Sequence, residues 1–118
     1  MKFTFALPLN LLNNQGMHWR KRNKLKKDWW SNADMLAMVK LNPKPPKKPY
    51  KKAKIKAHFY VWSKMDRIDN LPARMKWVMD WLQKNHYIDD DKNVDWAEPP
   101  KQTVDRTNRR VEVELIRG

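Results

Sequence analysis

The chain of 118 residues suits one compact domain spanning residues 1–118, and its lack of cysteine excludes disulfides, thiolate metal sites and cysteine nucleophiles. Lysine and arginine number 26 against 13 acidic residues, and this net charge of +13 is larger than solubility requires. A polyanion such as nucleic acid is therefore the natural partner, because basic surface attracts phosphates with little regard to base sequence.

The first element is a short strand predicted over Lys2 to Leu7. Phe3, Phe5 and Leu7 alternate with smaller residues, and Pro8 ends the pattern. The same opening lacks the apolar run of a signal peptide, and no run in the chain approaches the roughly 20 apolar residues that a membrane-spanning helix needs. We therefore expect a soluble, unprocessed cytoplasmic protein without a membrane partner.

After a loop over residues 10–19, an amphipathic helix is predicted from about Lys21 to Lys40. Its apolar face consists of Leu25, Trp29, Ala33, Leu36 and Ala37. A basic run covers the start of this helix and is expected to contact DNA phosphates, although a solvated helix face would have the same composition. The run consists of Arg20, Lys21, Arg22, Lys24, Lys26 and Lys27.

Four prolines make residues 42–50 an extended connector, because proline removes a backbone donor and fixes φ. A long strand follows from Lys52 to Trp62, and alternate residues are expected to face the core. These inward residues are Ala53, Ile55, Ala57, Phe59 and Val61. The outward face is basic, and its Lys54 and Lys56 are predicted DNA contacts.

A second helix is predicted from about Leu71 to Lys84, with Asp69 or Asn70 as its cap and Pro72 in its first turn. The helix is expected to bury Leu71, Met75, Val78, Met79 and Leu82. Helical spacing places Asp69, Lys76 and Asp80 on the opposite face, with Lys76 two turns along.

Strands over 93–97 and 109–116 complete the order βαβαββ. The predicted fold is an α/β (α+β) domain, in which two main helices pack on a small mixed β-sheet.

The tryptophans divide into two groups. The two predicted helices contain Trp29, Trp30, Trp77 and Trp81. Most of these four tryptophans are expected to pack in the core or in a dimer interface. Trp19, beside the basic run, and Trp62, near the first acids, are candidates for stacking on exposed bases.

Aspartates are scarce but gather in two groups on either side of the second helix. Asp66 and Asp69 precede it, and Asp89, Asp90 and Asp91 follow it. Carboxylates repel phosphate unless they hold a hard cation such as Mg²⁺, which binds phosphate oxygens and acidifies water. The pattern therefore indicates a magnesium site made by both groups, unless Asp69 only caps the helix and residues 89–91 form a solvated turn.

The segment DNLPARMKWVMDWL followed by YIDDDKNVDW resembles the signature of the RusA family of Holliday-junction resolvases. The opening LPLNLLNN also resembles the family's segment after its first strand, so the resemblance spans most of the chain. It implies a RusA-like, homodimeric, Mg²⁺-dependent crossover junction endodeoxyribonuclease. Such an enzyme resolves four-way DNA junctions by paired symmetric nicks that leave 5′-phosphates, in the recombination and repair of bacterial or phage DNA.

Carried over residue by residue, the resemblance implies that Asp69 binds metal and that Asp90 is the later essential aspartate, with Asp89 beside it. Lys76 matches the catalytic lysine.

One position departs from the family pattern. Arg67 stands where members usually have another aspartate, so Asp66, Asp89 or Asp91 is expected to supply that metal ligand. Arg67 is then a further candidate DNA contact.

Two other functions fit the same residues. One is a non-catalytic nucleic-acid-binding module, in which the aspartates are caps and turns. The other is a nuclease that acts on flaps or other branched DNA with the same chemistry.

Overall fold

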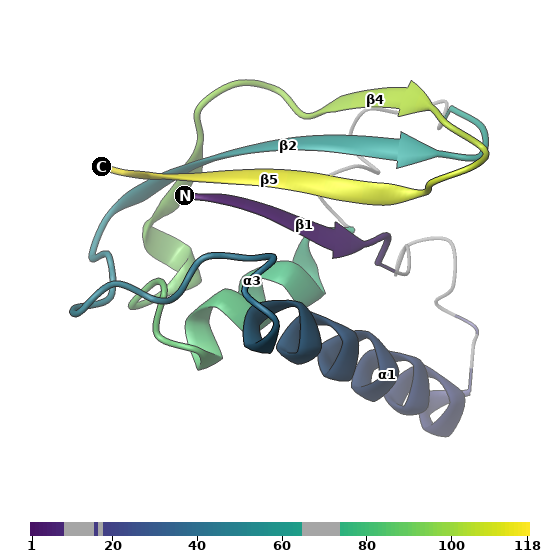
Figure 1. Ribbon diagram of the computed structural model, residues 1–118, viewed down its shortest axis with the longest axis horizontal. Coiled ribbons are helices and arrows are strands. Elements are labelled where there is room, and N and C mark those ends of the chain that lie inside the picture. Colours follow the sequence, from purple (N-terminus) through teal and green to yellow (C-terminus); the bar gives the residue numbers. More distant parts are fainter. Residues whose placement is uncertain (9–15, 17, 65–73) are drawn as a thin grey trace.

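The computed structural model describes residues 1–8, 16, 18–64 and 74–118. In this part of the chain a five-stranded mixed sheet forms one layer, and helices α1 and α3 form a second layer on one of its faces (Figure 1). The elements in chain order are β1 (Lys2–Ala6), α1 (Trp19–Met38), β2 (Ala53–Val61), α3 (Lys76–Lys84), the 3₁₀ turn η1 (Asp91–Asn93), β3 (Val94–Trp96), β4 (Lys101–Val104) and β5 (Arg110–Arg117). The predicted mixed sheet with two helices packed on it is confirmed.

The centre of the sheet is the long strand β2. The strand order is β1-β5-β2-β3, and β4 also pairs with β2. β5 runs antiparallel to both β1 and β2, whereas β3 and β4 run parallel to β2 along its other edge. The order of strands in the sheet therefore differs from their order in the chain.

Alternation along the strands separates a buried face from an open face. All five predicted inward residues of β2 are buried, together with the inward residues of β1 and β5, which are Phe3, Phe5, Val111, Val113 and Leu115. The ring centroid of Phe5 lies 5.5 Å from those of Trp29 and Trp81, one on each helix. The core is thus an aromatic layer between the sheet and the helices, as expected for Trp29, Trp77 and Trp81.

Two tryptophan indoles hold α1 in place. The Trp29 Nε1 donates a hydrogen bond of 2.7 Å to the carbonyl of Ala6 in β1, and the Trp81 Nε1 donates one of 2.9 Å to Asp34 Oδ1. α1 begins at Trp19 rather than Lys21, where the His18 side chain accepts from the amide of Arg20.

The start of the second helix differs from the prediction. α3 begins at Lys76 with Met75 as its N-cap residue, so Lys76 is its first residue rather than two turns along. The predicted caps Asp69 and Asn70 belong to residues 65–73, which lie outside the described part of the chain. The prediction was wrong because apolar residues at helical spacing continue upstream of Lys76, and periodicity alone does not mark where a helix begins.

Strand β4 was not predicted. Its sequence KQTV lacks apolar alternation and none of its residues is buried, since it lies at the sheet edge beside β2. Its end is fixed by the amide of Asp105, which donates to the carbonyl of Val61 over 2.9 Å.

Neither α1 nor α3, the helices in the described ranges, combines the length and the apolar character that crossing a bilayer requires.

Candidate metal and nucleic-acid site

A tight turn connects the end of α3 to the second aspartate group, residues 89–91. His86 adopts a left-handed backbone with φ of 66°, and the amide of Tyr87 returns to the carbonyl of Leu82 over 2.9 Å. Such a turn closes a helix end, although glycine usually occupies the left-handed position. Tyr87 and Ile88 are then buried, so the chain is anchored just before Asp89.

The proline-rich connector fixes the backbone at Asp89. Tyr50, at its end, forms an isolated parallel bridge with Ile88. Its amide donates to the carbonyl of Tyr87, and its carbonyl accepts from the amide of Asp89, each over 3.0 Å. The Asp89 side chain is exposed, so its oxygens face solvent from a rigid backbone.

Asp90 is held in its ionised form by the backbone that follows it. Its carboxylate accepts a 3.0 Å hydrogen bond from the amide of Lys92, as the N-cap of η1. This bond lowers the pKa of Asp90, and the Asp91 side chain and the Lys92 charge act in the same direction against partial desolvation. The carboxylate is therefore available as an anionic ligand.

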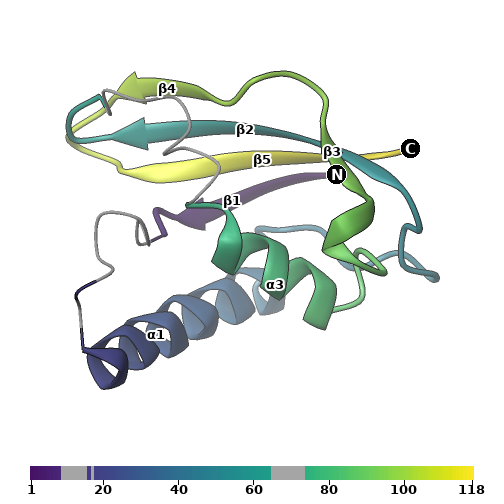
Figure 2. The same cartoon turned by 180° about the vertical axis from the view of Figure 1, so that it is seen from behind.

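Asp91 and Lys76 line the same pocket. The pocket has a volume of about 350 Å³ and lies between α3, β2 and β3; Figure 2 shows α3 beside the turn that leads into β3. Its other described lining residues are Ile55, Met75, Met79, Val94 and Trp96. Neither Asp89 nor Asp90 lines it. The structure thus brings Lys76, carried over from the resemblance, next to the third aspartate of the group rather than the second.

Lys76 is paired with a carboxylate. Its Nζ lies 3.3 Å from Asp80, which also lies 3.6 Å from the Nζ of Lys26 on α1. The Lys76 side chain remains 58% exposed, so the ion pair is solvated and weak, and a phosphate can replace Asp80 as its partner.

Three of the candidate residues, Asp66, Arg67 and Asp69, lie outside the described residues. Within residues 1–8, 16, 18–64 and 74–118, no three His, Asp or Glu side chains are grouped so that they could hold a metal ion. Of the described aspartates, Asp91 lines the pocket that contains Lys76, and Asp90 precedes Asp91 in the chain.

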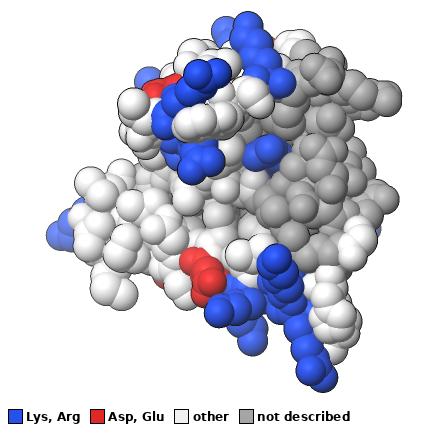
Figure 3. Space-filling model, turned by 90° about the vertical axis from the view of Figure 1, so that its right-hand side faces the viewer, with Lys and Arg blue, Asp and Glu red and all other residues white. Residues whose placement is uncertain are grey.

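The basic run on α1 is largely available to a ligand. Of its predicted phosphate contacts, Arg22 and Lys26 are half-buried and the others are exposed. Lys26 pairs with Asp80 and lies 5.1 Å from the ring of Trp30, so it also joins α1 to α3. Figure 3 views the end of the molecule where β2 and β4 end and α1 begins, and basic side chains gather there in two groups, above and below.

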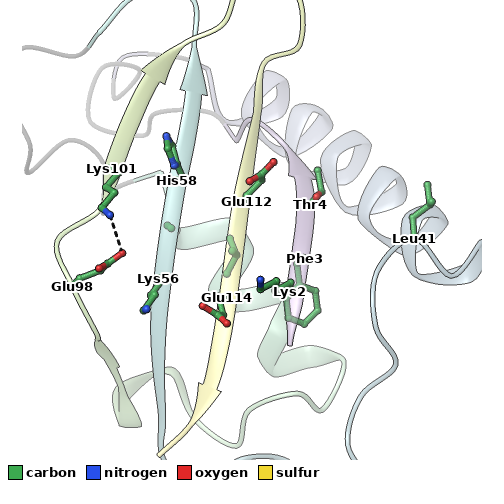
Figure 4. A pocket seen from close by; sticks show the side chains of 12 residues that line it. Lys2, Phe3, Thr4, Leu41, Lys56, His58, Glu98, Lys101, Glu112 and Glu114 are labelled. Atoms are coloured by element: carbon green, nitrogen blue, oxygen red, sulfur yellow. Dashed lines mark ion pairs between the residues drawn. The ribbon is translucent and has the colours of Figure 1, made fainter.

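The outward residues of β2 include Lys54 and Lys56, as predicted, but acidic residues of β5 stand beside them. Glu114 lies opposite Lys56, and Glu112 lies opposite His58. A hollow of about 470 Å³ on this open face is lined by lysines and glutamates from four strands or their flanks (Figure 4). This face lies on the other side of the sheet from α1 (Figure 1), and alternation along β2 puts Lys54 and Lys56 on it, so they do not extend the basic surface of that helix.

Sequence reasoning missed the arginines of the loop between β4 and β5. Arg106 and Arg109 lie over the exposed ring of Trp62, with 5.2 Å and 5.8 Å from guanidinium carbon to ring centroid. The run DRTNRR was a visible signal for them, but nothing in the sequence placed it beside Trp62.

No family model matches the chain, and no curated protein is significantly similar to it. A functional proposal therefore rests on the residues and on where the fold places them.

Proposed function

We propose that the protein is a magnesium-dependent DNA endonuclease of the RusA kind, which resolves four-way junctions by paired symmetric nicks. The observation that carries this proposal is the pocket shared by Lys76 and Asp91, with the ionised Asp90 adjacent, in a chain of net charge +13. An anionic backbone attracted by the basic surface would meet these carboxylates and the exposed Lys76 together.

The aspartates present suit Mg²⁺. This ion prefers oxygen ligands, keeps several of its waters, and commonly needs only one or two protein carboxylates. Asp90 and Asp91 would hold it, with Asp69 and Asp66 proposed as the ligands from the other segment. A bound Mg²⁺ would neutralise charge on a phosphate oxygen and acidify water for attack on phosphorus.

Lys76 would stabilise negative charge on the reacting phosphate. Its ammonium lies 3.3 Å from Asp80 at the first residue of α3, in a solvated pair that a phosphate could replace. Its place in the pocket with Asp91 would put the ammonium beside a phosphate held by the metal.

The first test is cleavage of a synthetic four-way junction with Mg²⁺ and with a chelator. We expect symmetric nicks with 5′-phosphates only when Mg²⁺ is present. Asp90→Asn and Asp91→Asn should each lower the cleavage rate by about a hundredfold or more, the scale of losing a metal ligand or its orientation. Junction binding in the chelator should stay within about twofold, because neither variant removes a cation.

The matched control is Asp28→Asn, which removes an exposed carboxylate from α1 and should cleave as the wild type does. Asp90→Asn keeps an oxygen that accepts from the Lys92 amide, so its fold is expected to persist. Tight junction binding without any cleavage in Mg²⁺ would overturn the nuclease proposal.

A homodimer is part of the proposal, because a four-way junction has approximate two-fold symmetry and two nicks need two active centres. Sedimentation of the protein with and without the junction measures this. A single protomer bound per junction would contradict it.

A second candidate function is a non-catalytic nucleic-acid-binding module. The ion pair between Lys76 and Asp80 favours it, since the lysine already has a structural partner. In that case Asp69→Asn and Asp90→Asn would leave every activity unchanged. A nuclease for other branched DNA is separated from both by comparing cleavage of junctions, flaps and plain duplexes.

A further inference from the structure

Trp62 follows the end of β2 as the last of three aromatic residues on the open face of the sheet. His58 and Tyr60 precede it at alternate positions, and their rings stack with centroids 4.4 Å apart and planes 11° apart. Trp62 itself is 55% exposed. An exposed indole offers a flat apolar face on which a planar ligand can stack.

The chain path brings arginines to this indole. β4 and β5 lie on opposite sides of β2, so the loop that joins them must cross the end of β2 where Trp62 emerges. Arg106 and Arg109 of this loop lie over the indole, and the Arg106 Nε also donates to the carbonyl of Trp62 over 3.3 Å. Despite these contacts, more than half of Trp62 remains accessible, enough for a flat ligand to stack.

The loop is preorganised by Asp105. Its Oδ1 accepts from the Thr107 amide and hydroxyl and from the Asn108 amide, at 2.8–3.2 Å. Its Oδ2 lies 3.2 Å from Arg110. A loop held by four hydrogen bonds loses less conformational entropy when it binds a ligand.

The positive charges of Arg106 and Arg109 remain available to bind an anionic ligand. Arg110 is engaged with Asp105 and Glu112, and its guanidinium lies 3.7 Å from the Tyr60 ring. By contrast, within the described residues no carboxylate pairs with Arg106 or Arg109. An exposed aromatic face flanked by unneutralised guanidinium groups is the combination that binds single-stranded nucleic acid.

We propose that Trp62, Arg106 and Arg109, here called the tip cluster, form a platform on which an unpaired base of DNA stacks while the arginines contact its phosphates. The choice of DNA as ligand rests on the proposed function. Stacking on Trp62 requires an unpaired base, because the faces of bases within a duplex are already covered by the neighbouring base pairs. An acidic protein would use the arginines without needing the ring.

The test measures binding of a labelled oligodeoxythymidylate of about eight nucleotides by fluorescence anisotropy in a chelator. Trp62→Ala should weaken binding by about fivefold to a hundredfold, as expected for loss of one stacked base, without changing the slope of affinity against salt. Arg106→Ala with Arg109→Ala should weaken binding and also lower that slope by about 1.4, for two fewer contacts to a single strand.

Met38→Ala is the matched control, since Met38 is also a large exposed apolar side chain but lies at the end of α1, away from both proposed sites. It should leave oligonucleotide affinity within about twofold. Equal losses in the Trp62 and Met38 variants would overturn the assignment to the tip cluster. Trp62→Phe, which keeps an aromatic ring, should recover much of the lost affinity.

Two further ligands complete the test. A blunt duplex and poly-glutamate should bind Trp62→Ala as well as they bind the wild type, since neither offers an unpaired base. An equal loss with poly-glutamate would point to an acidic protein partner and overturn the proposal. The outcome is separable from the nuclease proposal because every binding arm is run without Mg²⁺. If the wild type cleaves the junction in the separate assay with Mg²⁺ but Trp62→Ala binds the oligonucleotide unchanged, only the stacking platform is rejected.

Discussion

At the scale of single residues, two aspartates act on the backbone around them. Asp90 accepts from the Lys92 amide and opens η1, and Asp105 accepts from the amides of Thr107 and Asn108. Both therefore keep their negative charge at lower pH than an ordinary aspartate does. Asp90 thereby shapes the turn beside the pocket of Lys76, and Asp105 shapes the loop of the tip cluster.

The stabilising effect of Asp105 should depend on pH. The Thr107 hydroxyl and the amides of Thr107 and Asn108 lower the pKa of Asp105 below its ordinary 3.8. A lowered pKa in the folded state means that the stabilisation is complete above 3.8 and is lost as pH falls through the lower folded value. Asp105→Ala should therefore be less stable than the wild type near neutral pH, and the difference should shrink in acid.

Urea unfolding near neutral pH and well below the ordinary pKa measures this difference. Asp28→Ala serves as the control, since Asp28 is an exposed aspartate on α1. A gap between Asp105→Ala and the wild type that stays constant across the range would contradict the assigned role.

At the scale of elements, the packing of α3 against α1 places Lys76. Trp81 is buried under the sheet, and its indole donates to Asp34 on α1. Asp80, its neighbour on α3, joins Lys26 of α1 to Lys76. The helix that carries the candidate lysine is thus fixed by its buried apolar face and by two polar contacts to α1.

Trp81→Phe should destabilise the protein by about 1–3 kcal/mol, because it removes one hydrogen bond and leaves a small cavity. Asp34 remains exposed to water, so no buried acceptor is left without a partner. Thermal or urea unfolding measures the change, and Trp19→Phe, at an exposed position, should stay within about 0.5 kcal/mol of the wild type. A similar change in both variants would show that Trp81 does not fasten the helices.

At the scale of the whole molecule, the positive charge is divided between two layers. One part lies on α1, and another lies on the open face of the sheet, where the glutamates of β5 balance it. Because the sheet separates these faces, a DNA molecule bound along α1 does not meet Lys54 and Lys56 on the same surface.

Charge reversal should distinguish the two faces. Changing Lys21, Lys24 and Lys27 of α1 to glutamate should weaken duplex binding and lower the slope of log affinity against log salt by about three, for three fewer phosphate contacts. The matched variant with glutamate at Lys2, Lys54 and Lys56 should lower it by less than about one. The opposite order would mean that DNA lies on the open face.

Local patterns determined much of this protein in advance. Alternation predicted the buried face of β2, and helical periodicity predicted α1 and the apolar face of α3. These features depend on neighbours within a few residues, which the sequence displays directly. The start of α3 and the edge strand β4 were not predicted, because neither has a pattern of apolar residues that marks its boundary.

Only the tertiary structure decided which distant residues meet. The pairing of β5 with β2 put Glu114 beside Lys56, and the β4–β5 crossing carried Arg106 to Trp62. The return of the chain after α3 brought Asp91 to the pocket of Lys76. Strand order and crossing points follow from how all elements bury their apolar faces together, so no local stretch of sequence encodes them.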